Sequence, residues 1–299
     1  MKYFITGGSG LIGQFLIPKI EANGDEWVNF DRSISDRNDI MSLSDMDTRL
    51  FVEQPDVVIH LAAQSGVEPA RQGSGKSLYL NIMGTVNVLE ACKTLGIKNV
   101  IVASSNHVYG DQKEWPVKED APLNQRDLYS ASKICADVIT QAYTHNYDMN
   151  TVAVRLTNTY GPGDMHDDHI IPGTIQSLLR GESPVIRSDG QIRKSYLYGA
   201  DCADAFITIA ENCETLRGQS VNVVGCKPIS SMKLVETMIE MADADVRPTI
   251  LGEATDQNHE NMDSSKMTAL GWEPKIDIYE GLEKTYTWFA ERAKQTVMA

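Results

Sequence analysis

The chain of 299 residues has few cysteines, few basic residues and no long apolar run, and each shortage argues against a class of protein. Its five cysteines are odd in number and scattered, without the spacing of a metal site or a disulfide framework, which predicts a reducing, cytoplasmic location. Lysine and arginine total 27 against 41 aspartates and glutamates, a formal charge of −14, so we expect no nucleic-acid partner. Because the sequence has no stretch of about 18 apolar residues and no signal-peptide layout, we expect no membrane partner.

The first 31 residues carry the pattern of a dinucleotide-binding turn. Residues 2–5 are a short apolar run suited to a buried strand, and apolar residues recur at helical spacing over 14–22. Between them, TGGSGLIG (6–13) places three glycines where the backbone can approach a pyrophosphate at a helix N-terminus. Asp31 ends the next apolar run and is placed to accept hydrogen bonds from ribose hydroxyls. The pattern favours NAD over NADP, although Arg32 could in principle serve a 2′-phosphate.

Apolar strand-like runs alternate with helical stretches through the first half of the chain. This alternation predicts an α/β fold, a Rossmann-type doubly wound parallel sheet with a small C-terminal substrate-binding α/β domain. The expected strands cover 57–63, 99–104 and 151–156, and the expected helices cover 78–95 and 129–147. We expect an NAD-binding domain over 1–165 with a returning segment near 195–225, and a substrate-binding domain over 166–194 and 226–299.

The stretch YSASK (129–133) places Tyr129 and Lys133 four residues apart, on one face of a helix. A tyrosine with its ordinary pKa of about 10 is a poor base at neutral pH. We expect the neighbouring ammonium, together with a nicotinamide cation, to lower the pKa of Tyr129. The serines at 104 and 105 follow a strand, so a hydroxyl there can reach the same pocket. The set predicts proton transfer at Tyr129.

Together these motifs resemble an extended short-chain dehydrogenase/reductase of the nucleotide-sugar epimerase and dehydratase kind. The resemblance covers nearly the whole chain. It rests on TGGSGLIG (6–13), Asp31, Asp39-Ile40, HLAAQSGV (60–67), NIMGTVNVLEA (81–91), SSNHVYG (104–110), YSASK (129–133), RLTNTYGPG (155–163), LGWEP (270–274), Gly281-Leu282 and Trp288-Phe289.

The resemblance implies a role for each matching residue. Tyr129 would take the proton of a sugar hydroxyl while NAD takes the hydride from its carbon, and Ser105 would bond the same oxygen. Asn158 matches a residue that contacts the sugar or its phosphates, and the helices around 78–95 and 129–147 would pair two subunits as a homodimer. The implied cofactor residues are Gly7, Gly10, Leu11, Ile12 and Gly13 at the pyrophosphate, Asp31 and Arg32 at the adenosine ribose, Asp39 and Ile40 at the adenine, Leu61, Ala62 and Ala63 along the cofactor, and Lys133 at the nicotinamide ribose.

The residues beside Ser105 separate two fates of the transient keto-sugar. Dehydratases of this kind usually carry an acidic residue there, whereas this chain has Asn106 and His107. Asparagine cannot exchange a proton at ordinary pH, but His107 is a candidate acid or base because an imidazole titrates near neutrality. The missing carboxylic acid favours an NAD-dependent nucleotide-sugar 4-epimerase acting through a 4-keto-sugar, with Asn106 as a substrate contact.

Two alternatives stay open. Segments 170–175 and 180–190 look most like the substrate segment of CDP-glucose 4,6-dehydratases, so a 4,6-dehydratase using His107 is the nearest one. The family's Arg-Asp before an aromatic is replaced by Lys194-Ser195-Tyr196, and 253–261 lacks the arginine of the family's Arg-Pro-Gly-Asp stretch. Because lysine lacks the two-pronged phosphate bond of arginine, the change also admits an NAD-dependent sugar or uronate dehydrogenase, which the chain resembles at SSNH (104–107). The candidate substrate-binding cations are Arg187, Arg193 and Lys194.

The run HDDH (166–169) contains four potential metal ligands. A tight run cannot easily wrap one ion, so we predict no metal site. His60 ends a buried strand, and we expect a structural role for it.

Overall fold

The computed structural model describes residues 1–73, 75–252 and 260–298, which form two compact units. Unit 1 comprises Met1–Thr157, Cys202–Val223 and Met262–Glu273. Unit 2 comprises Asn158–Asp201, Val224–Asn261 and Pro274–Ala299.

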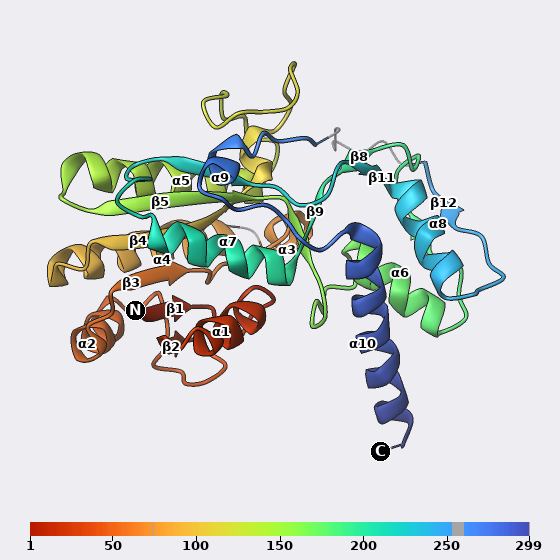
Figure 1. Cartoon of the computed structure of the whole chain (residues 1–299), viewed down its shortest axis with the longest axis horizontal. Coiled ribbons are helices and arrows are strands. Elements are labelled where there is room, and N and C mark those ends of the chain that lie inside the picture. The colour runs from red at the N-terminus through yellow and green to blue at the C-terminus, as the bar shows by residue number, and fades with distance from the viewer. Residues whose placement is uncertain (74, 253–259, 299) are drawn as a thin grey trace. The chain divides into compact units, whose positions relative to one another are not determined.

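Unit 1 is built on a six-stranded parallel sheet with the strand order β10-β5-β4-β3-β1-β2 (Figure 1). The chain turns from β1 to β2 on one side and continues from β3 to β10 on the other, so the order reverses between β1 and β3. Ligands of such sheets bind at this reversal, beyond the carboxyl ends of the strands. The predicted Rossmann-type α/β fold is confirmed. The strands are β1 (Lys2–Thr6), β2 (Glu26–Phe30), β3 (Val57–His60), β4 (Asn99–Ser105), β5 (Asn150–Leu156) and β10 (Ser220–Val223).

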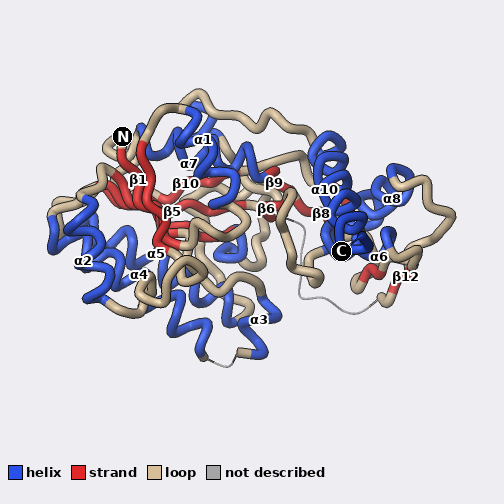
Figure 2. The backbone as a smooth tube through the Cα atoms, turned by 90° about the horizontal axis from the view of Figure 1, so that it is seen from below, coloured by secondary structure: helices blue, strands red, loops and turns tan. Residues whose placement is uncertain are grey.

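Helices cover both faces of this sheet (Figure 2). Tyr3 and Phe4 are adjacent in β1 and both fully buried, and since successive strand residues point to opposite faces, neither face meets solvent. Phe4 packs in one core with Leu50 and Leu89, which lie on two different helices. The helices of unit 1 are α1 (Gly13–Ala22), α2 (Leu43–Glu53), α3 (Val67–Gln72), α4 (Lys76–Leu95), the 3₁₀ turn η1 (Asn106–Tyr109), α5 (Leu128–Asn146), α7 (Gly199–Glu211, from Cys202 onward) and α9 (Ser265–Ala269).

The segment 262–273, which we expected in the second domain, belongs to unit 1. Two hydrogen bonds tie it to β10: the Lys266 ammonium donates to the Ser220 carbonyl at 3.0 Å, and the Asn222 amide donates to the Asp263 carbonyl at 3.0 Å. Residues 158–165, which we expected in the first domain, belong to unit 2 because the strand that they begin pairs there.

The described residues of unit 2 form short strand pairs and three helices. The pairs are β6 (Asn158–Tyr160) with β9 (Tyr196–Tyr198), β8 (Arg193–Lys194) with β11 (Ile229–Ser230), and β7 (Val185–Ile186) with β12 (Thr249–Ile250). The helices are α6 (Ile170–Leu179), α8 (Ser231–Met241) and α10 (Ile278–Met298). Gly281 on α10 packs so closely on β6 that an added Cβ would lie 2.0 Å from the Tyr160 hydroxyl.

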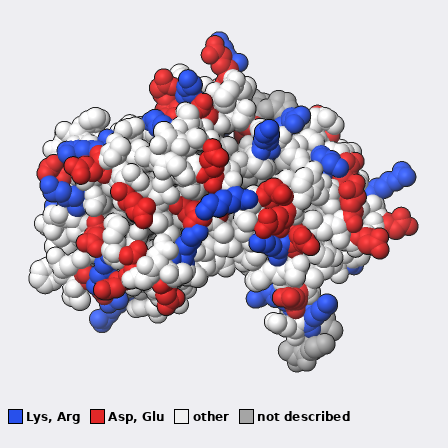
Figure 3. All heavy atoms as spheres, in the orientation of Figure 1, with Lys and Arg blue, Asp and Glu red and all other residues white. Residues whose placement is uncertain are grey.

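None of the helices in the described ranges is both long and apolar enough to span a bilayer. On the face shown in Figure 3, acidic and basic side chains are interspersed.

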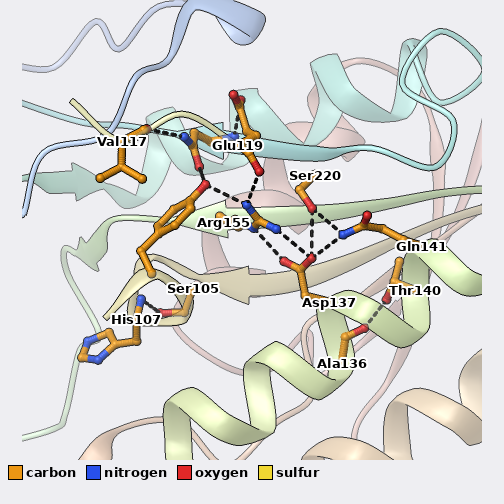
Figure 4. Close-up of polar contacts among 12 residues, drawn as sticks. Ser105, His107, Val117, Glu119, Ala136, Asp137, Thr140, Gln141, Arg155 and Ser220 are labelled. Carbon is orange, nitrogen blue, oxygen red and sulfur yellow. Dashed lines mark hydrogen bonds and ion pairs between the residues drawn. The ribbon is translucent and has the colours of Figure 1, made fainter. Parts of the chain in front are cut away.

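A buried ion pair fastens α5 to the sheet. The Arg155 guanidinium on β5 donates to both carboxylate oxygens of Asp137 on α5, from Nε at 2.8 Å and from Nη2 at 3.0 Å. Arg155 Nη1 also donates to the Tyr109 hydroxyl and the Glu119 carbonyl, and the Ser220 hydroxyl donates to Asp137 (Figure 4). Burial lowers the pKa of Arg155, but the hydrogen bond and charge of Asp137, together with Tyr109, raise it more, so the guanidinium stays charged.

Replacing Asp137 by Ala should be severely destabilising, because it leaves the Arg155 guanidinium buried without its counterion. We expect a loss of about 3–5 kcal/mol in the free energy of unfolding, measured by equilibrium urea denaturation. The matched control is Asp148→Ala, which removes an exposed carboxylate from its ion pairs with Lys98 and Arg217 and should cost little. Equal losses in the two variants would contradict the assignment.

Candidate functional site

The turn between β1 and α1 is shaped as a cradle for a negatively charged group. Gly7 has a φ of 71°, and a Cβ there would lie 2.6 Å from the Ala62 backbone nitrogen, so only glycine fits. A Cβ at Gly13 would lie 2.1 Å from the Gly8 carbonyl oxygen, whereas one at Gly10 would meet only the Gly7 carbonyl, at 3.3 Å. No side chain in the described parts of the chain caps α1 at Ile12. The helix end is therefore open to a pyrophosphate, the group that NAD presents.

Asp31 stands directly after β2, beside this turn. Its carboxylate accepts hydrogen bonds from the backbone amides of Ser9 at 3.1 Å and Ser33 at 2.9 Å. Partial burial raises the pKa of Asp31, but these amide hydrogen bonds lower it more, so the net shift is downward. A fixed carboxylate suits ribose hydroxyls and repels a 2′-phosphate. Arg32, the next residue, is exposed.

The segment after β3 completes the cradle. The Leu61 amide donates to the Thr6 carbonyl at 3.0 Å, and the Ala62 amide donates to the Thr6 hydroxyl at 3.3 Å. This holds Leu61 and Ala62 against the glycine turn, and Ala63 is the next residue. The Thr6 hydroxyl also bonds His60, whose burial lowers its pKa to about 3 and keeps it neutral.

Asp39 and Ile40 lie in the turn before α2. The Asp39 carboxylate accepts from the Met41 amide at 2.9 Å, and Ile40 is buried against Gly84 of α4, where an added Cβ would lie 2.5 Å from its Cδ1. Their implied contact with the adenine stays a prediction.

Lys133 is buried on α5, and its ammonium donates to the Ala103 carbonyl of β4 at 2.8 Å. Burial lowers the pKa of Lys133 to about 8. Tyr129 lies one turn earlier, in the first turn of α5, which a capping box between Asp127 and Ser130 begins. Both side chains therefore come from the helix end nearest the carboxyl end of β4.

The expected lowering of the Tyr129 pKa is wrong for the protein alone. Burial raises this pKa, and the hydrogen bond with Ser105 lowers it by less. The Asp127 carboxylate raises it further, while the Lys133 ammonium is directed to the Ala103 carbonyl. The same burial reduces dielectric screening, so a positive charge brought to the site would act strongly on the phenol.

Ser105 ends β4 and lies with His107 beside Tyr129. The Ser105 hydroxyl accepts from the His107 amide at 3.2 Å (Figure 4). It also donates to the Asn106 side-chain oxygen at 3.2 Å. The edge of one ring meets the face of the other between His107 and Tyr129, with centroids 5.5 Å apart. The structure thus brings the four candidate catalytic residues, Ser105, His107, Tyr129 and Lys133, to one end of the sheet.

The candidate substrate residues of unit 2 divide into two groups. Asn158 and Lys194 converge on Glu260: the Asn158 amide donates to its carboxylate at 3.0 Å, and the buried Lys194 ammonium lies 3.2 Å from it. The Arg193 guanidinium instead donates to the Pro228 carbonyl at 2.9 Å, and Arg187 is exposed after β7. Sequence reasoning missed Glu260, which no motif marks by itself, although it lies in the stretch 253–261 that was compared with the family's Arg-Pro-Gly-Asp segment. Of the stretch without arginine, 253–259 lies outside the described residues.

Comparisons with known proteins identify the family of the chain. A family model described as the NAD dependent epimerase/dehydratase family matches residues 3–225. A UDP-glucose 4-epimerase of Mycolicibacterium smegmatis is 28% identical to this chain and aligns over 98% of this chain and 100% of its own length. A dTDP-D-glucose 4,6-dehydratase of Mus musculus is 26% identical over 96% and 88%. The solved UDP-N-acetylglucosamine 4-epimerase of Methanobrevibacter ruminantium M1 superposes with a TM-score of 0.88 at 27% identity, covering 97% of this chain and 98% of its own.

Replacing Lys133 by Met should change how stability depends on pH in protein stripped of nucleotide. Burial lowers the pKa of Lys133 from 10.5 to about 8, so the charged form costs stability below pH 8, and this cost vanishes as the pH rises towards 10.5. The variant lacks this cost. Its gain in unfolding free energy over the parent, followed by urea denaturation, should shrink by about 3 kcal/mol across that window. The exposed control Lys98→Met should show no such trend, and a pH-independent gain for Lys133→Met would contradict the prediction.

Proposed function

The chain belongs to the NAD-dependent epimerase/dehydratase family, and we propose that it is a nucleotide-sugar 4-epimerase that acts through a transient 4-keto-sugar. The NAD cofactor predicted from the glycine turn and Asp31 is confirmed. When bound, NAD accepts a hydride from the sugar carbon and returns it within the same turnover. The residues that would hold it are the glycine turn, Asp31, the backbone at Ala62 and Lys133.

In this proposal, the chain's own residues move and hold the hydroxyl proton. Tyr129 takes it, and Ser105 donates a hydrogen bond to the same sugar oxygen. Because burial raises the pKa of Tyr129, its phenolate needs positive charge brought to the site. The Ala103 carbonyl holds the Lys133 ammonium in the place from which it would bind the nicotinamide ribose.

The residues beside Ser105 support epimerisation most directly. Elimination of the C6 hydroxyl needs a general acid near Ser105, and the Asn106 side chain at this place is not an acid at ordinary pH. Asn106 is buried and accepts the Ser105 hydroxyl hydrogen bond through its amide oxygen. Relatives of both kinds are similar to this chain at comparable identity, so the proposal depends on this position and not on overall likeness.

A 4,6-dehydratase is the second candidate, and one observation favours it. The His107 ring lies against the Tyr129 ring, so an imidazole stands beside the proposed base where dehydratases have an acid. A net sugar or uronate dehydrogenase is the third alternative.

In the substrate grip that we propose, Asn158 and Lys194 hold a phosphate oxygen of the nucleotide. Both now contact the Glu260 carboxylate, which has the charge and hydrogen-bonding capacity of such an oxygen. A bound diphosphate would therefore compete with Glu260. In this proposal, Asn158 and Lys194 take the place of the arginine that the family's phosphate-binding motif carries.

A homodimer also stays a prediction. Tyr79 on α4 is 63% exposed and Val138 on α5 is 52% exposed, which supports pairing through these helices. The cytoplasmic location stays a prediction too.

The proposed function predicts the product of incubation with a panel of nucleotide-activated sugars. An epimerase yields an isomer of unchanged mass and no net NADH, as seen by mass spectrometry, NMR and absorbance. A stable 4-keto-6-deoxy sugar would establish the dehydratase instead. NADH formed in proportion to an oxidised sugar would establish the dehydrogenase. If the protein is an epimerase, His107→Asn should keep a turnover rate within about tenfold of the parent. If it is a dehydratase, the same variant should lose the dehydratase reaction.

Replacing Glu260 by Gln should strengthen the grip on the nucleotide sugar. The change removes the competing negative charge, so we expect the KM to fall roughly three- to tenfold while kcat changes little. Steady-state kinetics at low and high salt measure this, and high salt should reduce the effect. The control Glu236→Gln, at an exposed site on α8, should change neither constant. An unchanged or raised KM in Glu260→Gln would contradict the assignment of Asn158 and Lys194 to phosphate binding.

A further inference from the structure

The turn between β6 and α6 gathers three potential metal ligands that the proposed reaction does not use. Asp164 is 1% exposed, and its two carboxylate oxygens each face one imidazole. Oδ1 lies 2.9 Å from His166 Nδ1, and Oδ2 lies 3.1 Å from His169 Nδ1. The two rings stack with centroids 4.8 Å apart. One ligand atom from each side chain lies within 4.8 Å of the others.

Backbone hydrogen bonds fix this arrangement. The Asp164 amide donates to the Gly161 carbonyl at 3.2 Å, and the His169 amide donates to the His166 carbonyl at 3.1 Å. His169 then precedes the first turn of α6, where its carbonyl accepts from the Gly173 amide at 2.9 Å. The chain therefore folds back within six residues and presents three side chains to one point.

The charge of the cluster calls for a cation. The Asp164 side chain is buried, and a buried carboxylate needs a positive charge beside it. Among residues 1–73, 75–252 and 260–298, no lysine or arginine pairs with it, and its partners are His166 and His169. Asp167 and Asp168 add two acidic residues to the same turn. A buried carboxylate in this setting is stable beside a protonated histidine or a bound cation.

We propose that Asp164, His166 and His169 bind one divalent transition-metal ion of the zinc class. Two imidazole nitrogens and a carboxylate oxygen are ligands of such ions, whereas Mg²⁺ and Ca²⁺ take oxygen. One ligand atom from each residue lies within 4.8 Å of the others, and each imidazole lies 2.9 or 3.1 Å from a different Asp164 oxygen. A small rotation of the carboxylate would bring one oxygen towards the about 3.3 Å that separates neighbouring ligands of a tetrahedral ion bound at about 2.0–2.1 Å. Water fills the fourth position.

Metal binding changes the protonation of the two histidines. The ion takes the place of the two Nδ1–H hydrogen bonds, so each neutral imidazole carries its proton on Nε2, and any protonated histidine releases one proton to solvent. The bound ion cross-links the two ends of the turn that joins β6, which carries Asn158, to α6. The sequence-based expectation of no metal site considered only the run 166–169. Asp164, the buried third ligand of the proposed site, lies outside this run.

The test is titration of the 299-residue chain, with its NAD retained, after EDTA treatment and desalting. Calorimetry with Zn²⁺ alone should show one equivalent bound with a Kd in the micromolar range or tighter, and Mg²⁺ should not bind. His169→Ala and His166→Gln should each weaken Zn²⁺ binding at least tenfold. The control His145→Ala, at an exposed histidine on α5, should leave it unchanged.

Substitution by Co²⁺ provides a measurement on the unaltered chain. Bound Co²⁺ should show visible d–d bands without the charge-transfer band of a thiolate ligand. That band would place the ion on one of the five cysteines and overturn the proposal. The proposal is also overturned by the absence of saturable binding at one equivalent, or by equal weakening in His145→Ala and His169→Ala. None of these readouts requires turnover, so they do not depend on which sugar the enzyme converts.

Discussion

The packing of α5 over the carboxyl end of β4 is the constraint on which the proposed chemistry depends. Ser105 belongs to the strand and Tyr129 to the helix, and the hydrogen bond from the Lys133 ammonium to the Ala103 carbonyl ties the two elements together beside them. One turn beyond Lys133, the buried Asp137–Arg155 pair fastens the same helix to β5. Burial between α5 and β4 raises the pKa of Tyr129 and lowers the pKa of Lys133. The protonation states of both side chains therefore depend on charges placed within the site.

Those parts of the fold and site that depend on local sequence could be predicted. The spacing of the glycines at 7, 10 and 13 is sufficient to predict the dinucleotide-binding turn. Asp31 could be predicted as a ribose ligand because it directly follows the next strand of the same βαβ unit. Tyr129 and Lys133 share a helix face because four residues make about one turn. The alternation of strand-like and helical patterns was enough to predict the parallel sheet.

The features that sequence reasoning missed depend on contacts between distant segments. Glu260 reaches Asn158 and Lys194 from far along the chain, and no pattern marks it. Residues 262–273 join unit 1 through single hydrogen bonds to β10. The Tyr129 pKa depends on burial, which the Tyr-to-Lys spacing does not reveal. The cluster of Asp164 and two histidines needed the turn itself, because the run 166–169 contains only part of it.

The central claim is that Tyr129 moves the hydroxyl proton, and its most direct test compares turnover in Tyr129→Phe and Tyr143→Phe. Both residues lie on α5, but the Tyr143 hydroxyl bonds Glu90 at the far end of the helix. The account predicts that Tyr129→Phe retains bound NAD and loses turnover by about 10²–10⁴-fold, while Tyr143→Phe remains active. Turnover by Tyr129→Phe at the level of Tyr143→Phe would contradict the account.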